Sequence, residues 1–380
     1  MDFPTLEQLK NRQTRKWTVY GEDVLPLWIA ESDFATSPAV MECLRDRVEA
    51  ESFGYSPAND HLEQALAEFC AEEFGWHPNP EHIVLTPDVV RSLFLAITYF
   101  TTPDSAVIVP TPAYPPFLAL PTATGRDMIE ISAEGGLDLG DIERAFQQGA
   151  GSILLCNPHN PLGYTFSREF LVELANLANR YGARIISDEI HAPLVYEGQH
   201  LPTASVSETA AAVTITAMAT SKAWNIAGLK CAQMIFSNPE DFKIWSTLPG
   251  PVTDGVGTLG IFAAEACYRD RSDHREEQLA YLRENRDWLA AELPRRIPGL
   301  RVSCPEATYL MWLDFRETSL PEEARRNPAA WCLEHAKVAM NEGLAFGLPG
   351  EGHARLNFAT SREILEEAVD RLEAALTPSA

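Results

Sequence analysis

The sequence predicts an α/β protein in which a large, mostly parallel sheet covered by helices is joined to a smaller α+β domain. The length of 380 residues exceeds the ~150 residues of an average domain, so two domains are expected. Short apolar runs of strand length alternate with amphipathic helical stretches through the middle of the chain. This alternation ends after about residue 293, and the pattern that follows is typical of a small mixed domain.

The large sheet is expected from six apolar runs, at residues 82–85, 106–109, 152–156, 184–187, 213–216 and 231–236. Between the third and the fourth run, an apolar stripe at helical spacing predicts a helix through Phe170, Leu171, Leu174, Leu177 and Ala178. Gly182, just beyond the stripe, is a typical helix stop. Strand, helix and strand together predict a βαβ unit.

The remaining elements are expected to form the connection and the second domain. A helical region over 258–293, interrupted near 269–277, leads out of the sheet. Strands at 307–315 and 355–359 surround a helix over 331–340, and a last helix begins with Thr360 and Glu363 in capping-box spacing. We expect a segment 1–45 that packs with the small domain, a large domain over 46–279 and a small domain over 280–380.

Composition excludes several classes of partner. The 30 basic and 54 acidic residues give a net charge of −24, which repels phosphate backbones and anionic lipids. We therefore expect a small-molecule site and neither a nucleic-acid nor a membrane partner. No apolar run reaches the ~18 residues of a membrane span, which favours a cytoplasmic protein. Seven cysteines without a C-x-x-C pair argue against a disulfide framework and against a metal site.

Two segments bring polar side chains to the carboxyl edge of the predicted sheet. The turn 157–163, N-P-H-N-P-L-G, follows the third strand, and its prolines and glycine aim the Asn160 amide over that edge. Asp188 ends the next strand, so both side chains are expected in the crevice where open α/β sheets bind ligands. An acid at a strand end is often only a helix cap, so Asp188 alone does not establish a site.

Lys222 is a third candidate site residue, and it indicates what Asn160 and Asp188 could bind. It is one of only six lysines, and it follows an apolar strand in A-T-S-K-A-W-N-I-A-G-L-K. A lysine among small and apolar residues is desolvated, which lowers its pKa and frees the amine to bond an aldehyde. An isolated lysine would more often extend to the surface. Together with Asn160 and Asp188, Lys222 indicates a site for pyridoxal 5'-phosphate (PLP), an aldehyde cofactor that uses these three groups.

The motifs N-P-H-N-P-L-G, S-D-E-I-H and S-K-A-W-N-I-A-G-L resemble those of the fold-type I PLP-dependent enzymes, the aminotransferase class I/II superfamily. Within it, the chain is most similar to the MalY/PatB-type cystathionine β-lyases, which are cysteine C–S lyases. The resemblance covers nearly the whole chain, through matching blocks at residues 25–34, 53–55, 111–117, 308–315 and 355–359. The combination of D-E-I-H with A-G-L favours a lyase over a plain aminotransferase.

The resemblance implies a role for each matching residue. Lys222 would carry the cofactor aldehyde and remove the substrate α-proton. Asp188 would pair with the pyridinium nitrogen, Asn160 would bond the ring hydroxyl, and Tyr114 would stack on the ring. Arg355 would clamp the substrate carboxylate bidentately, although an arginine in a strand is more often a surface residue.

Other residues would surround the ring and the phosphate. His191 would lie near the ring edge, with a buried structural histidine as an equal alternative. The segment T-P-D-V-V-R-S opens a helix whose free N–H groups suit an anion. The expected phosphate ligands are the Val89 and Val90 amides, Ser221, Lys230 and Tyr55. Tyr55 would reach across from a second subunit, which makes a homodimer the expected assembly.

Some positions depart from the family pattern. Asp88 stands in place of a glycine and brings a negative charge close to the expected phosphate, while Arg91 replaces a proline or small residue. Ala219 lacks the hydroxyl of typical aminotransferases. Pro115 replaces a second tyrosine of several C–S lyases, and Ala307 replaces a glycine. The departures at Asp88 and Arg91 concern the phosphate site, and those at Pro115 and Ala307 concern the substrate.

The expected reaction is α,β-elimination from a cysteine S-conjugate such as L-cystathionine, which gives a thiol, pyruvate and ammonia. Aminotransfer remains an alternative because it shares the removal of the α-proton, and so does a specialised-pathway lyase that acts on a thiol adduct. A regulatory protein that only retains the fold is disfavoured by the complete set Lys222, Asp188, Asn160 and Arg355. A nucleotide-binding protein would need a Gly-rich loop after its first strand, which the sequence lacks.

Overall fold

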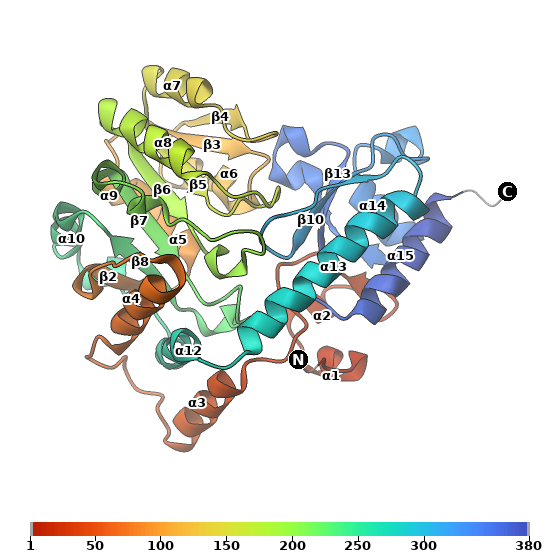
Figure 1. Cartoon of the computed structure of the whole chain (residues 1–380), viewed down its shortest axis with the longest axis horizontal. Helices are drawn as coiled ribbons and strands as arrows, with labels where there is room; N and C mark the ends of the chain where they lie inside the picture. The colour runs from red at the N-terminus through yellow and green to blue at the C-terminus, as the bar shows by residue number, and fades with distance from the viewer. Residues whose placement is uncertain (1–2, 378–380) are drawn as a thin grey trace.

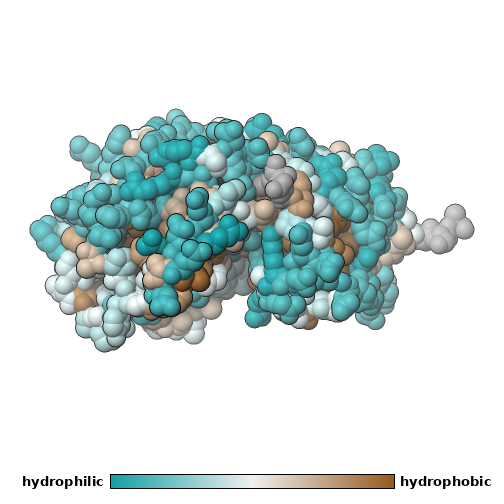
Figure 2. Space-filling model, turned by 90° about the horizontal axis from the view of Figure 1, so that it is seen from below, coloured by the Kyte–Doolittle hydropathy of each residue, from teal (hydrophilic) through white to brown (hydrophobic). Residues whose placement is uncertain are grey.

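The computed structural model describes residues 3–377 and divides into two parts that lie side by side (Figure 1). The larger part contains a seven-stranded sheet with helices on both faces, and the smaller part contains a four-stranded sheet packed against two long helices. Seen from below in Figure 2, the surface is mostly hydrophilic, as the net charge of −24 leads one to expect. No helix within residues 3–377 combines the length and the apolar character needed to cross a membrane.

The large sheet has the strand order β2-β8-β7-β6-β5-β3-β4. Its strands are β2 (Ile83–Thr86), β3 (Ala106–Thr111), β4 (Met128–Ser132), β5 (Ala150–Cys156), β6 (Arg184–Asp188), β7 (Thr214–Met218) and β8 (Ala232–Phe236). All run parallel except β8, which is antiparallel to both of its neighbours. The mostly parallel sheet is confirmed. β4 was not expected from the sequence, because this edge strand alternates exposed and half-buried residues and is not a continuous apolar run.

Helices cover the large sheet because neighbouring residues of each strand point to opposite faces. Leu154 of β5 packs with Leu93 and Ile97 of α5 (Val89–Phe100), while Ile153 and Leu155 pack on the other face with α8 (Arg168–Arg180). The predicted βαβ unit is therefore β5-α8-β6. The other helices around this sheet are α3 (Pro38–Glu49), α4 (His61–Phe74), α6 (Pro115–Ala123), α7 (Leu139–Gln147), α9 (Glu208–Val213), α10 (Pro239–Trp245), α11 (Gly250–Thr253) and α12 (Thr258–Arg269).

The smaller part is built on an antiparallel sheet of order β12-β13-β10-β9. Its strands are β9 (Arg301–Val302), β10 (Leu310–Asp314), β12 (Asn341–Glu342) and β13 (His353–Asn357), and its helices are α13 (His274–Arg296), α14 (Pro328–His335) and α15 (Arg362–Leu376). The N-terminal segment contributes α1 (Leu6–Asn11), α2 (Arg15–Thr18) and β1 (Leu25–Pro26), which pairs in parallel with β11 (Val338–Ala339). The domain limits at residues 45 and 279 remain predictions.

Two details of the smaller part differ from the expectation. The helix expected over 331–340 ends at His335, because Lys337 has a positive φ of 55° and residues 338–339 form β11 instead. The last helix is capped by Ser361, whose hydroxyl accepts a hydrogen bond from the Ile364 N–H, and not by Thr360. Ser361 is a cap of equal quality one residue later, so the pattern of capping residues alone does not place the start.

Candidate active site

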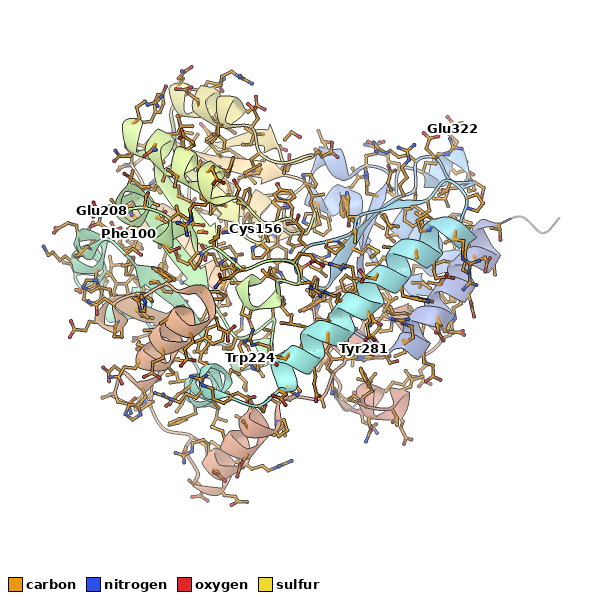
Figure 3. All side chains as sticks on the ribbon, in the orientation of Figure 1. Phe100, Cys156, Glu208, Trp224, Tyr281 and Glu322 are labelled. Carbon is orange, nitrogen blue, oxygen red and sulfur yellow. The ribbon has the colours of Figure 1, made fainter. Side chains whose placement is uncertain are left out.

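A cavity of about 450 Å³ lies at the carboxyl edge of the large sheet, where this edge meets the smaller part of the molecule. Its walls come from the residues that follow β2, β3, β5, β6 and β7, from β13, and from the N-terminal residues 28–30. Cys156, the last residue of β5, lines this cavity near the middle of the molecule (Figure 3). Strand ends and the second sheet therefore enclose the site together.

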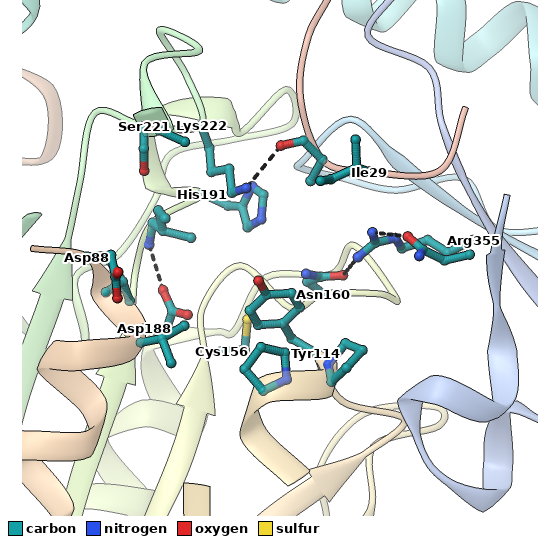
Figure 4. Close-up of a pocket in the computed structure, with 18 of the residues that line it drawn as sticks. Ile29, Asp88, Tyr114, Cys156, Asn160, Asp188, His191, Ser221, Lys222 and Arg355 are labelled. Atoms are coloured by element: carbon teal, nitrogen blue, oxygen red, sulfur yellow. Dashed lines mark hydrogen bonds between the residues drawn. The ribbon is translucent and has the colours of Figure 1, made fainter. Parts of the chain in front are cut away.

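Lys222 lies in the turn after β7 and points into the cavity (Figure 4). Its Nζ donates a hydrogen bond of 3.0 Å to the backbone carbonyl of Ala30, in the N-terminal segment. Burial, together with the positive charge of Arg355, lowers the pKa of Lys222 to about 8, and the Asp188 carboxylate partly opposes this shift. About a tenth of the amine is thus neutral at pH 7, far more than for an ordinary lysine, and a nucleophile or base requires this neutral form.

Asp188 and Asn160 stand on neighbouring strands because β5 and β6 are paired in parallel with Cys156 opposite Asp188. Asp188 is only 5% exposed and accepts a hydrogen bond of 3.0 Å from the Ile190 N–H. Burial raises its pKa to about 7, against the lowering effects of that hydrogen bond and of the Lys222 charge. A second positive charge inside the cavity, such as a pyridinium, would hold this carboxyl ionised.

The turn that carries Asn160 depends on its glycine. Gly163 has a φ of 76°, and a Cβ there would lie 2.2 Å from the Cβ of Pro305. The Gly163 N–H closes the turn on the carbonyl of His159 at 2.7 Å. Any larger residue would push this turn away from Pro305 and move the Asn160 amide with it.

Arg355 enters the cavity from β13, on the side opposite Asp188 (Figure 4). Its Nη1 donates to Asn160 Oδ1 at 3.0 Å, and its Nη2 donates to the carbonyl of Trp28 at 3.2 Å. The side chain is buried at 3% exposure, and burial lowers its pKa to about 10. It therefore remains a fixed cation at physiological pH and a natural partner for a substrate carboxylate.

Tyr114 and His191 line the cavity between these charges. Tyr114 lies at the N-terminal end of α6, and burial raises the pKa of its hydroxyl. Burial also lowers the pKa of His191 to about 3, with further lowering by Lys222 and Arg355. His191 is consequently neutral at physiological pH. Its ring can donate or accept a single hydrogen bond at each nitrogen, and it cannot act as a cation.

One end of the cavity collects donors for an anion. The helix α5 begins at Val89, so the Val89 and Val90 N–H groups lie in its first turn, and Ser221 and Lys230 complete the wall. Asp88 is the N-cap of α5: its Oδ1 accepts from the Arg91 N–H at 2.9 Å, and its Oδ2 binds Lys230 Nζ at 2.8 Å. The Arg91 guanidinium instead donates to the carbonyl of Val252.

Ten of the eleven residues predicted for the site line this cavity. The exception is Tyr55, whose side chain is fully exposed and lies outside the cavity of its own chain. Such a position is compatible with a tyrosine that binds the phosphate in a second subunit. The assignment of Tyr55 to the phosphate site remains a prediction. The roles given to the ten cavity residues likewise remain predictions.

Some cavity residues were not predicted as part of the site. These are Trp28, Ile29 and Ala30 of the N-terminal segment, together with Cys156, Asn341 and Phe346. The block L-P-L-W-I-A-E-S-D-F, which resembles the family pattern, is the one sequence signal for the N-terminal segment. The polar groups that this segment contributes are the backbone carbonyls of Trp28 and Ala30. Every residue type carries a carbonyl, so the sequence gives no indication of these two contacts.

The fold and the cavity define an α/β enzyme that binds a cofactor through a lysine at the carboxyl edge of its sheet. The family model for aminotransferase class I and II matches residues 22–372, so the chain belongs to this family. It is 54% identical to the cystathionine beta-lyase of Corynebacterium glutamicum over 99% of this chain and 100% of the relative. It is 33% identical to the cystathionine beta-lyase PatB of Bacillus subtilis over 99% and 100% of the two chains.

The fold is also that of solved relatives. A crystal structure from Corynebacterium diphtheriae, described as a candidate PLP-dependent β-cystathionase, superimposes with a TM-score of 0.97 at 55% identity and covers both chains completely. The predicted family and the fold-type I architecture are thereby confirmed. The family is PLP-dependent and acts on amino acids.

The residues present fit PLP. Lys222 offers an amine for the aldehyde, Asp188 a carboxylate for the ring nitrogen, and Asn160 an amide for the ring hydroxyl. The first turn of α5 offers N–H groups for the phosphate. Within the described residues, His191 Nδ1 and Arg355 Nε are buried on the cavity wall without a hydrogen-bond partner, as expected of groups that face a ligand.

Proposed function

We propose that the chain is a PLP-dependent carbon–sulfur β-lyase that converts L-cystathionine or a related cysteine S-conjugate into a thiol, pyruvate and ammonia. The observation that carries this proposal is the convergence of Lys222, Asp188, Asn160 and Arg355 on one cavity. The similarity to two cystathionine beta-lyases along the full chain supports the lyase outcome over aminotransfer. PLP supplies the electron sink that makes the α-proton of the amino acid acidic.

Substrate binding begins with the α-carboxylate. The Arg355 guanidinium already makes three hydrogen bonds, to Asn160, to the carbonyl of Trp28 and to Asn341 Oδ1, so its plane is fixed before the substrate arrives. A carboxylate bound to this fixed cation orients the bonds at Cα and places the α-proton toward Lys222 Nζ. The orientation is therefore set by the protein before any bond breaks.

Proton transfer then falls to Lys222. Its amine, with a pKa of about 8, is basic enough to take the α-proton and neutral in a sufficient fraction of molecules to do so. The resulting ammonium at Lys222 Nζ is the donor in the cavity for the departing sulfur. With PLP bound, the Asp188 carboxylate would favour the protonated form of the ring nitrogen. The apolar side chains of Trp28, Pro115 and Pro116 would limit water in the cavity.

We further propose a homodimer in a reducing compartment such as the cytoplasm. Phe53 and Tyr55 are 63% and fully exposed, in a segment that would present both rings to a second subunit. The seven cysteines are free thiols in the described chain, which suits a reducing environment. Tyr55 would complete the phosphate site of the partner chain.

The test is incubation of the purified PLP-loaded enzyme with L-cystathionine and no keto acid, with pyruvate and free thiol assayed together. We expect equal amounts of both over many turnovers. The variant Lys222→Ala, which keeps the cavity but loses the base, should lower this rate at least about a thousandfold. Amino-group transfer that begins only when a keto acid is added would instead identify an aminotransferase and contradict the proposal.

A further inference from the structure

Asp88 places a carboxylate at the end of the cavity that collects anion donors. It lies on the same side of the cavity as Ser221 (Figure 4), and its Oδ2 is 2.8 Å from Lys230 Nζ. The side chains of Asp88 and Lys230 are 41% and 58% exposed, so the pair borders the cavity and is reached by solvent. Lys230 is the one side-chain cation at this end of the cavity among the described residues.

The Asp88 carboxylate is held in its ionised form. Burial alone would raise its pKa, but hydrogen bonds from Lys230 and from the Arg91 N–H, together with the charges of these two residues, lower it below the ordinary value. A full negative charge therefore stands among the N–H, hydroxyl and ammonium groups that would bind the cofactor phosphate. Phosphate and carboxylate repel each other, and both are attracted to the same ammonium.

We propose that Asp88 competes with the cofactor phosphate for Lys230, so that PLP binds more weakly than it would beside a neutral residue. Lys230 Nζ would exchange the carboxylate for the phosphate when PLP binds, and would return to Asp88 when PLP leaves. The inference rests on the phosphate placement in the proposed function. Its consequence is an enzyme whose cofactor is exchangeable, with an internal anion that satisfies Lys230 in the cofactor-free protein.

The decisive variant is Asp88→Asn, because it removes the charge and keeps the helix cap. An asparagine Oδ1 accepts the Arg91 N–H as the aspartate does, so α5 should begin at the same residue. With the cofactor-free protein titrated by PLP, we expect about a tenfold lower Kd for the variant and a slower release of PLP. An unchanged or higher Kd would overturn the proposal and make Asp88 a residue that orients Lys230.

A cofactor without phosphate separates competition from other effects of the substitution. Titration with pyridoxal should give the same Kd for Asp88→Asn and for the parent, since pyridoxal brings no anion to Lys230. A tenfold change with pyridoxal as well would mean that the variant alters the ring site, and would overturn the competition. The difference in the Kd for PLP between Asp88→Asn and the parent should also become smaller as the salt concentration rises, because solvent reaches the charges of both Asp88 and Lys230.

Two further variants keep the proposal falsifiable. Asp88→Ser is a second neutral cap and must show the same tighter binding of PLP. Lys230→Met should weaken PLP binding. In its presence the Asp88→Asn substitution should change the Kd for PLP less than it does in the parent, because only the direct repulsion between carboxylate and phosphate remains. If Lys230→Met leaves the Kd for PLP unchanged, the phosphate does not bind Lys230 and the proposed competition with Asp88 is wrong. The pyruvate and thiol assay would still test the lyase reaction separately.

Discussion

At the residue scale, burial and then the neighbouring charges set the pKa values of Lys222 and Asp188. Burial lowers the pKa of Lys222, and the Arg355 charge lowers it further. The Asp188 carboxylate acts in the opposite direction, and the Lys222 charge in turn opposes the rise that burial causes at Asp188. Burial thus brings the two pKa values together, to about 8 for the amine and about 7 for the carboxyl, while the attraction between the two charges acts to separate them.

The lowered pKa of Lys222 predicts how cofactor attachment depends on pH. Only the neutral Lys222 amine can bond the aldehyde, so the attachment rate of PLP to the cofactor-free protein should rise about tenfold per pH unit below pH 8 and level off above it. The measurement is borohydride trapping at pH 6 to 10, followed by mass spectrometry of the Lys222 peptide. A midpoint near the ordinary value of 10.5 would contradict the assigned environment.

The same experiment has two signed controls. Arg355→Gln removes a charge that lowers the Lys222 pKa, so its midpoint should move to higher pH. Asp188→Asn removes a charge that raises the Lys222 pKa, so its midpoint should move to lower pH.

The lowered pKa of Lys222 also affects the stability of the cofactor-free protein. Between pH 8 and pH 10.5 the unfolded chain binds a proton at Lys222 that the folded chain lacks. The contribution of Lys222 to the free energy of unfolding should therefore rise with pH in this window.

Residue chemistry was the most predictable level of the site. Asp188 ends a strand, and Asn160 and Lys222 lie in the turns that follow two others; parallel pairing brings such positions to one sheet edge. The carbonyl of Ala30, which accepts from Lys222, was not predictable because backbone groups carry no sequence signature. The capping role of Asp88 was not predicted either, although an aspartate before V-V-R is an ordinary N-cap.

At the element scale, the N-terminal strap, residues 28–33, is held across the cavity by side chains from both parts of the molecule. Asn357 Nδ2 donates to the carbonyls of Ile29 and Glu31 at 2.6 and 2.8 Å. Asn225, three residues after Lys222, donates to the carbonyl of Ser32 at 2.8 Å and accepts from its N–H at 2.9 Å. The strap thus joins the turn that carries Lys222 to the strand that carries Arg355.

We expect the Asn225 side chain to position the strap. Asn225 has a positive φ of 56°, so glycine is the clean deletion of the side chain and alanine would add strain. Asn225→Gly should lower kcat/KM about tenfold and increase hydrogen exchange of the Ser32 amide, because both bonds to Ser32 are lost. Asn225→Asp keeps the acceptor for the Ser32 N–H and should protect that amide almost fully. Faster exchange across the whole protein would instead indicate general destabilisation.

Elements were predictable where they are buried and regular. The strands β5 and β6 each contain a buried apolar stretch, and the helix between them carries a clear apolar stripe, so the sequence predicts this βαβ unit. The two-residue strands β1 and β11 were not, because their pairing joins Leu25 to Val338 across more than three hundred residues and depends on tertiary structure. The strap follows this pairing directly and is held by Asn225 and Asn357, which are also distant in sequence, so the sequence alone did not place it in the cavity.

At the scale of the whole molecule, the cavity lies between the two parts, and the segment around Tyr55 lies outside it. Gly54 is anchored by a hydrogen bond of 2.8 Å from the Thr258 hydroxyl to its carbonyl, so the exposed tyrosine is attached to a fixed turn. A fully exposed aromatic ring two residues from the exposed ring of Phe53 is uncommon on a monomer surface. Which chain Tyr55 serves is a property of the assembly, and a single sequence gives no indication of it beyond resemblance.

Mixed dimers test whether Tyr55 completes the site of the partner chain. Lys222→Ala and Tyr55→Ala should each be weakly active alone, assayed at limiting PLP. After the two proteins are mixed and allowed to exchange subunits, half of the dimers are hybrids, and each hybrid contains one site with both Lys222 and a tyrosine from the neighbouring subunit intact. Activity should therefore recover to about one quarter of the parent value.

The alternative arrangement gives a different result in the same mixture. If Tyr55 served the cavity of its own chain, every site in the hybrid would lack either the lysine or the tyrosine, and mixing would restore nothing. The double variant Lys222→Ala/Tyr55→Ala, mixed with Tyr55→Ala, is the matched control, since no hybrid site then has both residues in either arrangement. Recovery confined to the first mixture would assign Tyr55 to the neighbouring subunit and make the dimer the smallest complete enzyme.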